Sequence, residues 1–234
     1  MHLGVRITRV TRDLWREETI ESRWEATAGV VLVIAVQLGA AFVSYRQDWA
    51  LPWWVWLIPV GPEIVLLVAL AWDRPRRRLE QMGRRRAFEL GLIAIVTLSN
   101  VGMLAALLVS LVTGHERSGG ELLLKGAAIW GTNVITFGLA FWTLDRGGPA
   151  SRIEPDPPLP DFQFPQHENP QLAPPDWSPR LFDYLYLSFT NSIAFSPTDA
   201  MPLSLTAKAL MLLESAISAT TVLLVASRAI NILK

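Results

Sequence analysis

Residues 181–208 have the sequence LFDYLYLSFTNSIAFSPTDAMPLSLTAK, and a long apolar stretch follows them. The first part, residues 181–195, is apolar but shorter than the roughly 20 residues that a helix needs to cross a bilayer. A Ser-Pro-Thr-Asp turn at 196–199 separates it from the long stretch. The pattern predicts a short helix, a polar turn and a long membrane-crossing helix.

The rest of the chain is dominated by long apolar segments of the same kind. Five segments are long enough to cross about 30 Å of hydrocarbon as helices. They are residues 26–43, 52–72, 88–112, 122–144 and 203–233. The sequence therefore predicts an all-α fold: a polytopic transmembrane helical bundle of five long spans plus one short or re-entrant pore-type helix.

Composition excludes several classes of function. Of the 234 residues, 51% are hydrophobic and only 18% are charged, against about 25% in soluble domains. There is no cysteine, and the three histidines are far apart, so thiolate and histidine metal sites are not expected. No phosphate-binding, dinucleotide or hydrolase motif occurs. We therefore expect no enzyme, no catalytic residue, no metal and no cofactor.

Arginines give the expected orientation. Five lie within residues 1–25 and seven in the loop 73–87, whereas the loops that alternate with these hold only Arg46 and Arg117. Short loops rich in arginine stay in the cytoplasm. The sequence thus predicts a multi-pass protein of the inner membrane with a cytoplasmic N-terminus. A topology signal also explains the arginine run better than nucleic-acid binding does, so no nucleic-acid partner is expected.

Four regions follow from these patterns. Residues 1–25 form a cytoplasmic or interfacial N-terminal helix, and residues 26–144 form four transmembrane helices with the basic loop 73–87. Residues 145–180 form a proline-rich, acidic linker that holds ten of the sixteen prolines. Proline interrupts both helices and sheets, so this linker is expected to be extended: either disordered or lying across the protein with Phe162, Phe164 and Trp177 as anchors. Residues 181–234 form the fourth region.

The fourth region has the elements of a pore loop. Tyr184, Tyr186 and Phe189 occupy a helix, residues 195–199 follow as Phe-Ser-Pro-Thr-Asp, and Pro202 precedes the last helix. From Asp183 to the C-terminus this arrangement resembles the pore domain of the potassium-channel superfamily, with its T-x-T-T-V-G-Y-G-D filter. The region is also similar to the C-terminal part of an uncharacterised family of five-span bacterial inner-membrane proteins.

The resemblance implies a pore, but with different ion chemistry. Ser196 and Thr198 stand where the family has glycines, and Pro197 replaces its tyrosine, so a ladder of potassium-binding carbonyls cannot form in the usual way. The resemblance then implies a channel for monovalent cations that is not potassium-selective, built as a homo-oligomer (a tetramer if it is pore-like) in a lipid bilayer. Its pore or filter-like residues would be Thr190, Asn191, Ser192, Phe195, Ser196, Pro197, Thr198 and Asp199.

The expected orientation conflicts with this resemblance. In the family the pore loop enters from outside, whereas the arginines place the linker inside. We expect that residues 181–199 cross as a short span and leave Asp199 outside, because seven arginines are hard to translocate. The alternatives are an external linker, or a helix–turn–helix without conduction.

Two acidic residues lie within predicted spans, Glu63 and Glu214. Glu63 follows Pro59-Val60-Gly61-Pro62, which predicts a broken helix, and an ionisable residue at that depth is either functional or serves packing. Glu214 is expected near a membrane face without a special role. Asn100 and Asn133 are expected to bond between helices. Two other functions stay open: a non-conducting scaffold or accessory subunit, and a proton-coupled transporter that uses Glu63.

Overall fold

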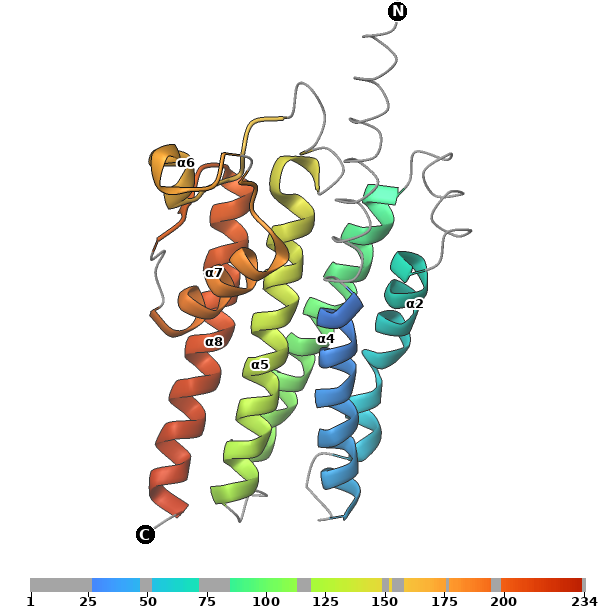
Figure 1. Ribbon diagram of the computed structural model, residues 1–234. Helices are drawn as coiled ribbons and strands as arrows, with labels where there is room; N and C mark the ends of the chain where they lie inside the picture. Colours follow the sequence, from blue (N-terminus) through green and yellow to red (C-terminus); the bar gives the residue numbers. More distant parts are fainter. Residues whose placement is uncertain are drawn as a thin grey trace, which may run out of the picture.

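The computed structural model describes residues 27–46, 52–71, 85–112, 119–148, 152, 158–175, 177–194 and 199–232 (Figure 1). The described chain is mostly helical. A first helix, Thr27–Arg46, precedes the labelled elements. These are η1 (Trp53–Leu57), α2 (Val60–Ala71), α4 (Arg85–Val112), α5 (Gly119–Leu144), η2 (Asp145–Gly147), β1 (Phe162–Gln163), α6 (Pro165–Glu168), η4 (Pro170–Leu172), α7 (Leu181–Ala194), β2 (Met201–Pro202) and α8 (Leu205–Ile232).

Three helices in the described part of the chain are long and apolar enough to cross a membrane. They are Thr27–Arg46, Leu122–Gly147 and Leu205–Ser227, and two shorter apolar helices cover Trp53–Val65 and Ala94–Val109. The predicted helical fold with membrane-length helices is therefore confirmed, whereas the count of five long spans stays a prediction. The predicted break before Glu63 is also present, because η1 ends at Leu57 and α2 begins at Val60.

Helix α5 is the centre of the bundle. It packs against α4, α7 and α8, and its side chains Ile129, Phe137 and Phe141 are fully buried. Glycine allows the closest of these approaches. A Cβ at Gly138 would lie 2.7 Å from Leu185 Cδ2 of α7, and one at Gly126 would lie 2.5 Å from Val225 Cγ2 of α8. The two glycines therefore let α5 approach both C-terminal helices closely.

Helix α7 enters the bundle and the chain returns to the end from which it entered. Its 14 residues span about 21 Å, less than the roughly 30 Å of a bilayer core. After α7, β2 pairs antiparallel with β1, with Phe162 opposite Pro202, and the Leu203 amide donates to the Asp161 carbonyl at 2.8 Å. Both ends of residues 181–202 thus lie at the linker end of the bundle (Figure 1). The expected short crossing with Asp199 at the opposite end is wrong.

The linker lies across the end of the bundle. Phe162 and Phe164 are buried, and the ring of Phe164 contacts those of Trp177 and Tyr184 with centroids 6.1 Å and 5.2 Å away. Of the two expected forms, the surface-lying one with aromatic anchors is confirmed for the described residues. The linker is not extended throughout as expected, because prolines at helix starts are compatible with the short α6 and η4.

Candidate functional site

A group of buried polar side chains joins four helices inside the bundle. We call it the Glu214 network. No member is more than 2% exposed, so each must find its hydrogen-bond partners within the protein. Its members are Asn100 of α4, Asn133 of α5, Ser188 and Asn191 of α7, and Glu214 and Ser218 of α8.

Helical spacing places these groups on facing sides. Residues 188, 191 and 192 share one face of α7, and residues 214, 218 and 221 share one face of α8, because residues three or four apart are neighbours on a helix. Ser192 and Thr221 are also buried on these faces, where each hydroxyl donates to a carbonyl of its own helix. The two polar faces meet where α7 packs against α8.

The carboxyl group of Glu214 is hydrogen-bonded to two side chains of α7. Asn191 Nδ2 donates to Glu214 Oε2 at 2.7 Å and to the Met211 carbonyl at 3.1 Å. Ser188 Oγ is hydrogen-bonded to Glu214 Oε1 and lies 2.7 Å from the Val134 carbonyl of α5. Glu214 is therefore buried between α5, α7 and α8. The sequence had led us to expect a position near a membrane face without a special role.

Two asparagines extend the network to α4. Asn133 Nδ2 donates to Ser218 Oγ at 2.9 Å and to the Glu214 backbone carbonyl at 3.3 Å. Asn100 Nδ2 donates to Asn133 Oδ1 at 3.1 Å, while Asn100 Oδ1 has no partner among the described residues. The prediction that Asn100 and Asn133 bond between helices is confirmed.

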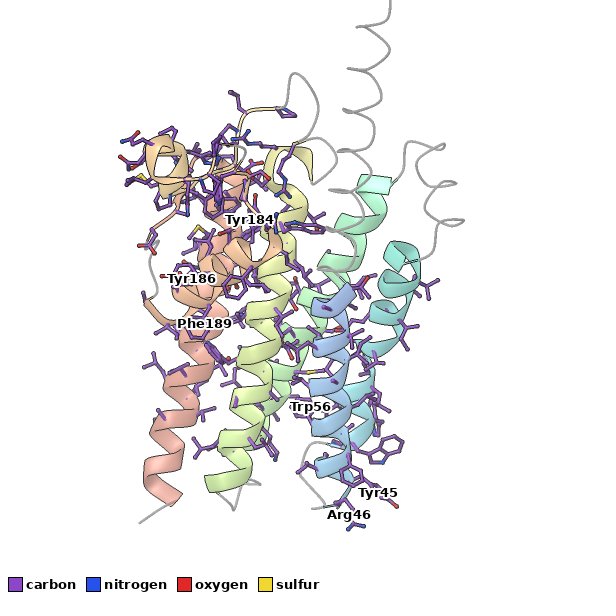
Figure 2. All side chains as sticks on the ribbon, in the orientation of Figure 1. Tyr45, Arg46, Trp56, Tyr184, Tyr186 and Phe189 are labelled. Atoms are coloured by element: carbon purple, nitrogen blue, oxygen red, sulfur yellow. The ribbon has the colours of Figure 1, made fainter. Side chains whose placement is uncertain are left out.

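The structure separates the filter-like residues that it describes. Asn191 and Ser192 are buried, whereas Asp199 is exposed and accepts a hydrogen bond from Tyr186 at 3.0 Å. The Thr190 hydroxyl lies 2.9 Å from the Tyr186 carbonyl and 3.0 Å from the Leu187 carbonyl of its own helix. Figure 2 shows Tyr184, Tyr186 and Phe189 along α7. The central residues of the predicted filter, Phe195, Ser196, Pro197 and Thr198, lie outside the described residues.

A second buried carboxyl group is Glu63, in the first turn of α2. It accepts a hydrogen bond from Gln37 Nε2 at 2.7 Å, and both side chains are at most 2% exposed. Gln37 Oε1 and Glu63 Oε2 have no partner among the described residues. Two buried acceptors without donors are costly, so this pair is a candidate site for a proton or another cation.

At the linker end, Asp145 fastens the linker to the bundle. Its Oδ1 accepts from the backbone amides of Asp161 at 2.7 Å and Phe162 at 3.3 Å. Its Oδ2 accepts from the Tyr184 hydroxyl at 2.5 Å. Asp145 follows α5, which ends at Leu144, so one carboxylate connects α5, the linker and α7. We call this group, together with Arg152, the linker clamp.

Arg152 completes the linker clamp. Its guanidinium donates to the Tyr184 hydroxyl at 2.8 Å, to the Pro179 carbonyl at 3.3 Å and to the Trp142 carbonyl. It also lies 5.0 Å from the Tyr184 ring centroid, within the range of a cation–π contact. Burial lowers the pKa of the Arg152 guanidinium, while Tyr184 and Asp145 act in the opposite direction. Sequence reasoning missed this clamp.

His167 is a titratable side chain with two partners in this part of the structure. Its Nδ1 accepts from the Phe164 amide at 3.2 Å, and its Nε2 lies 3.5 Å from Arg146 Nη2. Burial, and then the charge of Arg146, lower the pKa of His167 below 6.5, with Asp145 acting the other way. A second proton would occupy Nδ1, remove the bond from Phe164 and place a positive charge beside Arg146.

We expect the folded protein to lose stability as the pH falls past His167's ordinary pKa. The unfolded chain binds this proton more tightly than the folded one, so the free energy of unfolding is highest above pH 6.5 and declines below it, toward the lower folded pKa. Melting temperatures between roughly pH 7.5 and 5 would measure this. His167→Gln keeps an acceptor for the Phe164 amide and should flatten that part of the profile. An unchanged profile would contradict the expectation.

Among the described residues, no group of three or more His, Asp or Glu side chains could hold a metal ion. The buried polar groups of the described residues thus include the Glu214 network, the Gln37–Glu63 pair and the linker clamp. Comparison of the whole chain with protein-family models, with curated proteins and with solved structures finds no match.

Proposed function

We propose that this chain is a multi-pass protein of the bacterial inner membrane that forms, as a homo-oligomer, a cation-conducting pore without potassium selectivity. The observation that supports this is the re-entrant path of α7 between α5 and α8. A helix, a re-entrant helix and a second helix follow one another in the pore domain that residues 183–234 resemble. The loop of this chain opens on the side of the linker, whereas the pore loop of the family enters from outside.

The five spans of this proposal are the first helix, the pair η1 and α2, α4, α5 and α8. The Arg85 end of α4 and the linker end of α5 lie at the same end of the bundle (Figure 1). The basic loop 73–87 leads into α4, so the linker shares its side of the membrane. With arginines inside, the re-entrant turn opens to the cytoplasm and the N-terminus is cytoplasmic.

The proposal requires several copies of the chain, because one re-entrant helix cannot surround a pore. The surface of α7 that faces away from its own bundle is apolar. Phe182 is 75% exposed and Ile193 is 54% exposed, with Tyr186 and Phe189 between them. Neighbouring copies or lipid would cover this surface. The exposed Asp199 carboxylates of several copies would form a ring of the kind that favours cations.

Ion flux through the purified protein in liposomes tests the proposal. We expect the wild type to pass monovalent cations with little preference for potassium, and Asp199→Asn to lower that flux several-fold by removing the carboxylate ring. Asp183→Asn is the matched control and should not change flux, since within the described part of the chain the Asp183 carboxylate accepts only from the Arg180 amide at the start of α7. No conductance for any monovalent ion, with a monomer in detergent, would refute the pore.

The two buried carboxyl groups favour a second candidate, proton-coupled transport. Glu63→Gln would then abolish transport and leave the protein folded, and flux would depend on a proton gradient. A scaffold has less support, because much of the linker is bonded to the bundle. It predicts no flux, and co-purification of a partner that is lost when residues 150–180 are deleted.

A further inference from the structure

We propose that Glu214 is a proton-binding site whose proton fastens α7 to α8. In this site the Glu214 carboxyl group carries a proton on Oε1 and donates it to Ser188, which in turn donates to α5. The ligand is a proton, and the site is built from groups on three helices. It does not depend on whether the protein conducts ions.

The number of hydrogens available at the Ser188 hydroxyl indicates that Glu214 is protonated. Ser188 Oγ lies 2.7 Å from the Val134 carbonyl oxygen, which can only accept, and it is also hydrogen-bonded to Glu214 Oε1. A serine hydroxyl has one hydrogen. If Glu214 were ionised, two acceptors would compete for that hydrogen and one contact would be left without it. A protonated Glu214 supplies the second hydrogen, so both contacts are satisfied.

The contacts of the second carboxyl oxygen, Oε2, indicate which of the two oxygens carries the proton. Glu214 Oε2 accepts from Asn191 Nδ2 at 2.7 Å. The other hydrogen of this amide points to the Met211 carbonyl at 3.1 Å, so both hydrogens of Asn191 are used. Oε2 is thus the accepting oxygen, and Oε1 is the oxygen that donates.

The charges on the packed helices leave Glu214 without a counter-ion among the described residues. Its carboxyl partners are Ser188 and Asn191, both uncharged. Lys125 of α5 is eight residues before Asn133, a backbone rise of about 12 Å, and Lys208 is six residues before Glu214, a rise of about 9 Å. A buried carboxylate without a cation is costly, so the neutral acid suits this site. The other titratable groups on the described faces of α7 are Asp183, Tyr184, which bonds to Asp145, and Tyr186, which bonds to Asp199.

When the proton is released, Glu214 still has two hydrogen bonds to α7, in a second arrangement. The O–H bond of Glu214 breaks and the proton passes to water. The Ser188 hydroxyl can then rotate from the Val134 carbonyl to Glu214 Oε1, while Asn191 continues to donate to Oε2. One bond between α7 and α5 is lost and the bond between α7 and α8 reverses its direction. The charge state of Glu214 thereby controls how the re-entrant helix is held.

Infrared difference spectroscopy of the purified protein tests the site directly. At neutral pH the wild type should show the carbonyl stretch of a buried carboxylic acid, and Glu214→Gln should lose it. Ser188→Ala should move this stretch to higher frequency, because the acid loses the acceptor of its hydrogen bond. Ser192→Ala is the matched control, since its hydroxyl donates to the Phe189 carbonyl at 2.8 Å and not to Glu214. Glu63→Gln identifies any contribution from the other buried acid.

Two results would overturn the proposal. One is a difference spectrum of Glu214→Gln that lacks a carboxylate band instead of an acid band, because Glu214 would then be ionised. The other is an acid stretch that Ser188→Ala does not move. Glutamine can donate to Ser188 and accept from Asn191, so the variant should keep the wild-type melting temperature. If it fails to fold, the Ser188→Ala shift decides the question with Glu214 in place. Neither measurement uses ion flux, so a failure of the pore proposal would leave it standing.

Discussion

Replacement of Asp145 by alanine is expected to release the linker from the bundle and to lower the free energy of unfolding by about 3–5 kcal/mol. The substitution removes the acceptor of the Tyr184 hydroxyl and of the Asp161 and Phe162 amides. Each buried donor left without a partner costs about 1–3 kcal/mol. Arg152 would also remain buried without the nearby negative charge. Thermal unfolding in detergent measures the loss, and limited proteolysis of the linker locates it.

Asp183→Ala is the control for this measurement. Asp183 accepts one backbone amide, that of Arg180, at an exposed helix start, so its loss should cost only about 1 kcal/mol, as for a helix cap. The linker of this variant should stay as resistant to protease as in the wild type. If Asp145→Ala were no less stable than Asp183→Ala, the linker clamp would not be what holds the linker in place.

The features that local sequence determines were predictable. The lengths of the apolar segments gave the main helices to within a few residues, since burial in lipid needs about 20 of them. The short length of residues 181–195 predicted that α7 would not span comfortably. Polar side chains within apolar spans predicted the bond between Asn100 and Asn133. Each of these inferences needs only neighbours along the chain.

The features that depend on distant pairing were not predictable. The return of the chain to the linker end after α7 is accompanied by the pairing of β1 with β2, two strands of two residues each, and such short strands carry no periodic pattern. Asn191 and Ser192 were assigned to a filter because they align with a family motif. Their shared helix face with Ser188 was the local signal for burial against α8. The burial of Glu214 could be inferred only once α8 was known to pack against this face of α7. The linker clamp likewise depends on residues as far apart in the sequence as Asp145 and Tyr184.

Replacement of Gly138 by leucine is expected to displace the re-entrant helix. A Cβ at this position would lie 2.7 Å from Leu185 Cδ2 and 3.1 Å from Leu185 Cα, so even the first added carbon meets the backbone of α7. Overpacking of this kind costs about 1–3 kcal/mol or more. Leu185 is three residues before Ser188, so a shift of α7 would also lengthen the bonds to Val134 and Glu214. We therefore expect a lower melting temperature and a changed Glu214 acid stretch.

Gly102→Leu provides the same substitution without the contact. Gly102 is exposed on α4, and a Cβ there meets nothing within 4 Å, so it should change the melting temperature and the acid stretch little. Ion flux then separates the two proposals. A Gly138→Leu protein that remains folded should lose both the pore and the wild-type acid stretch, because both depend on where α7 lies. If it kept its flux while the stretch changed, conduction would not require the observed position of α7. If it kept both, the close approach of α5 and α7 at Gly138 would not determine how the re-entrant helix is held.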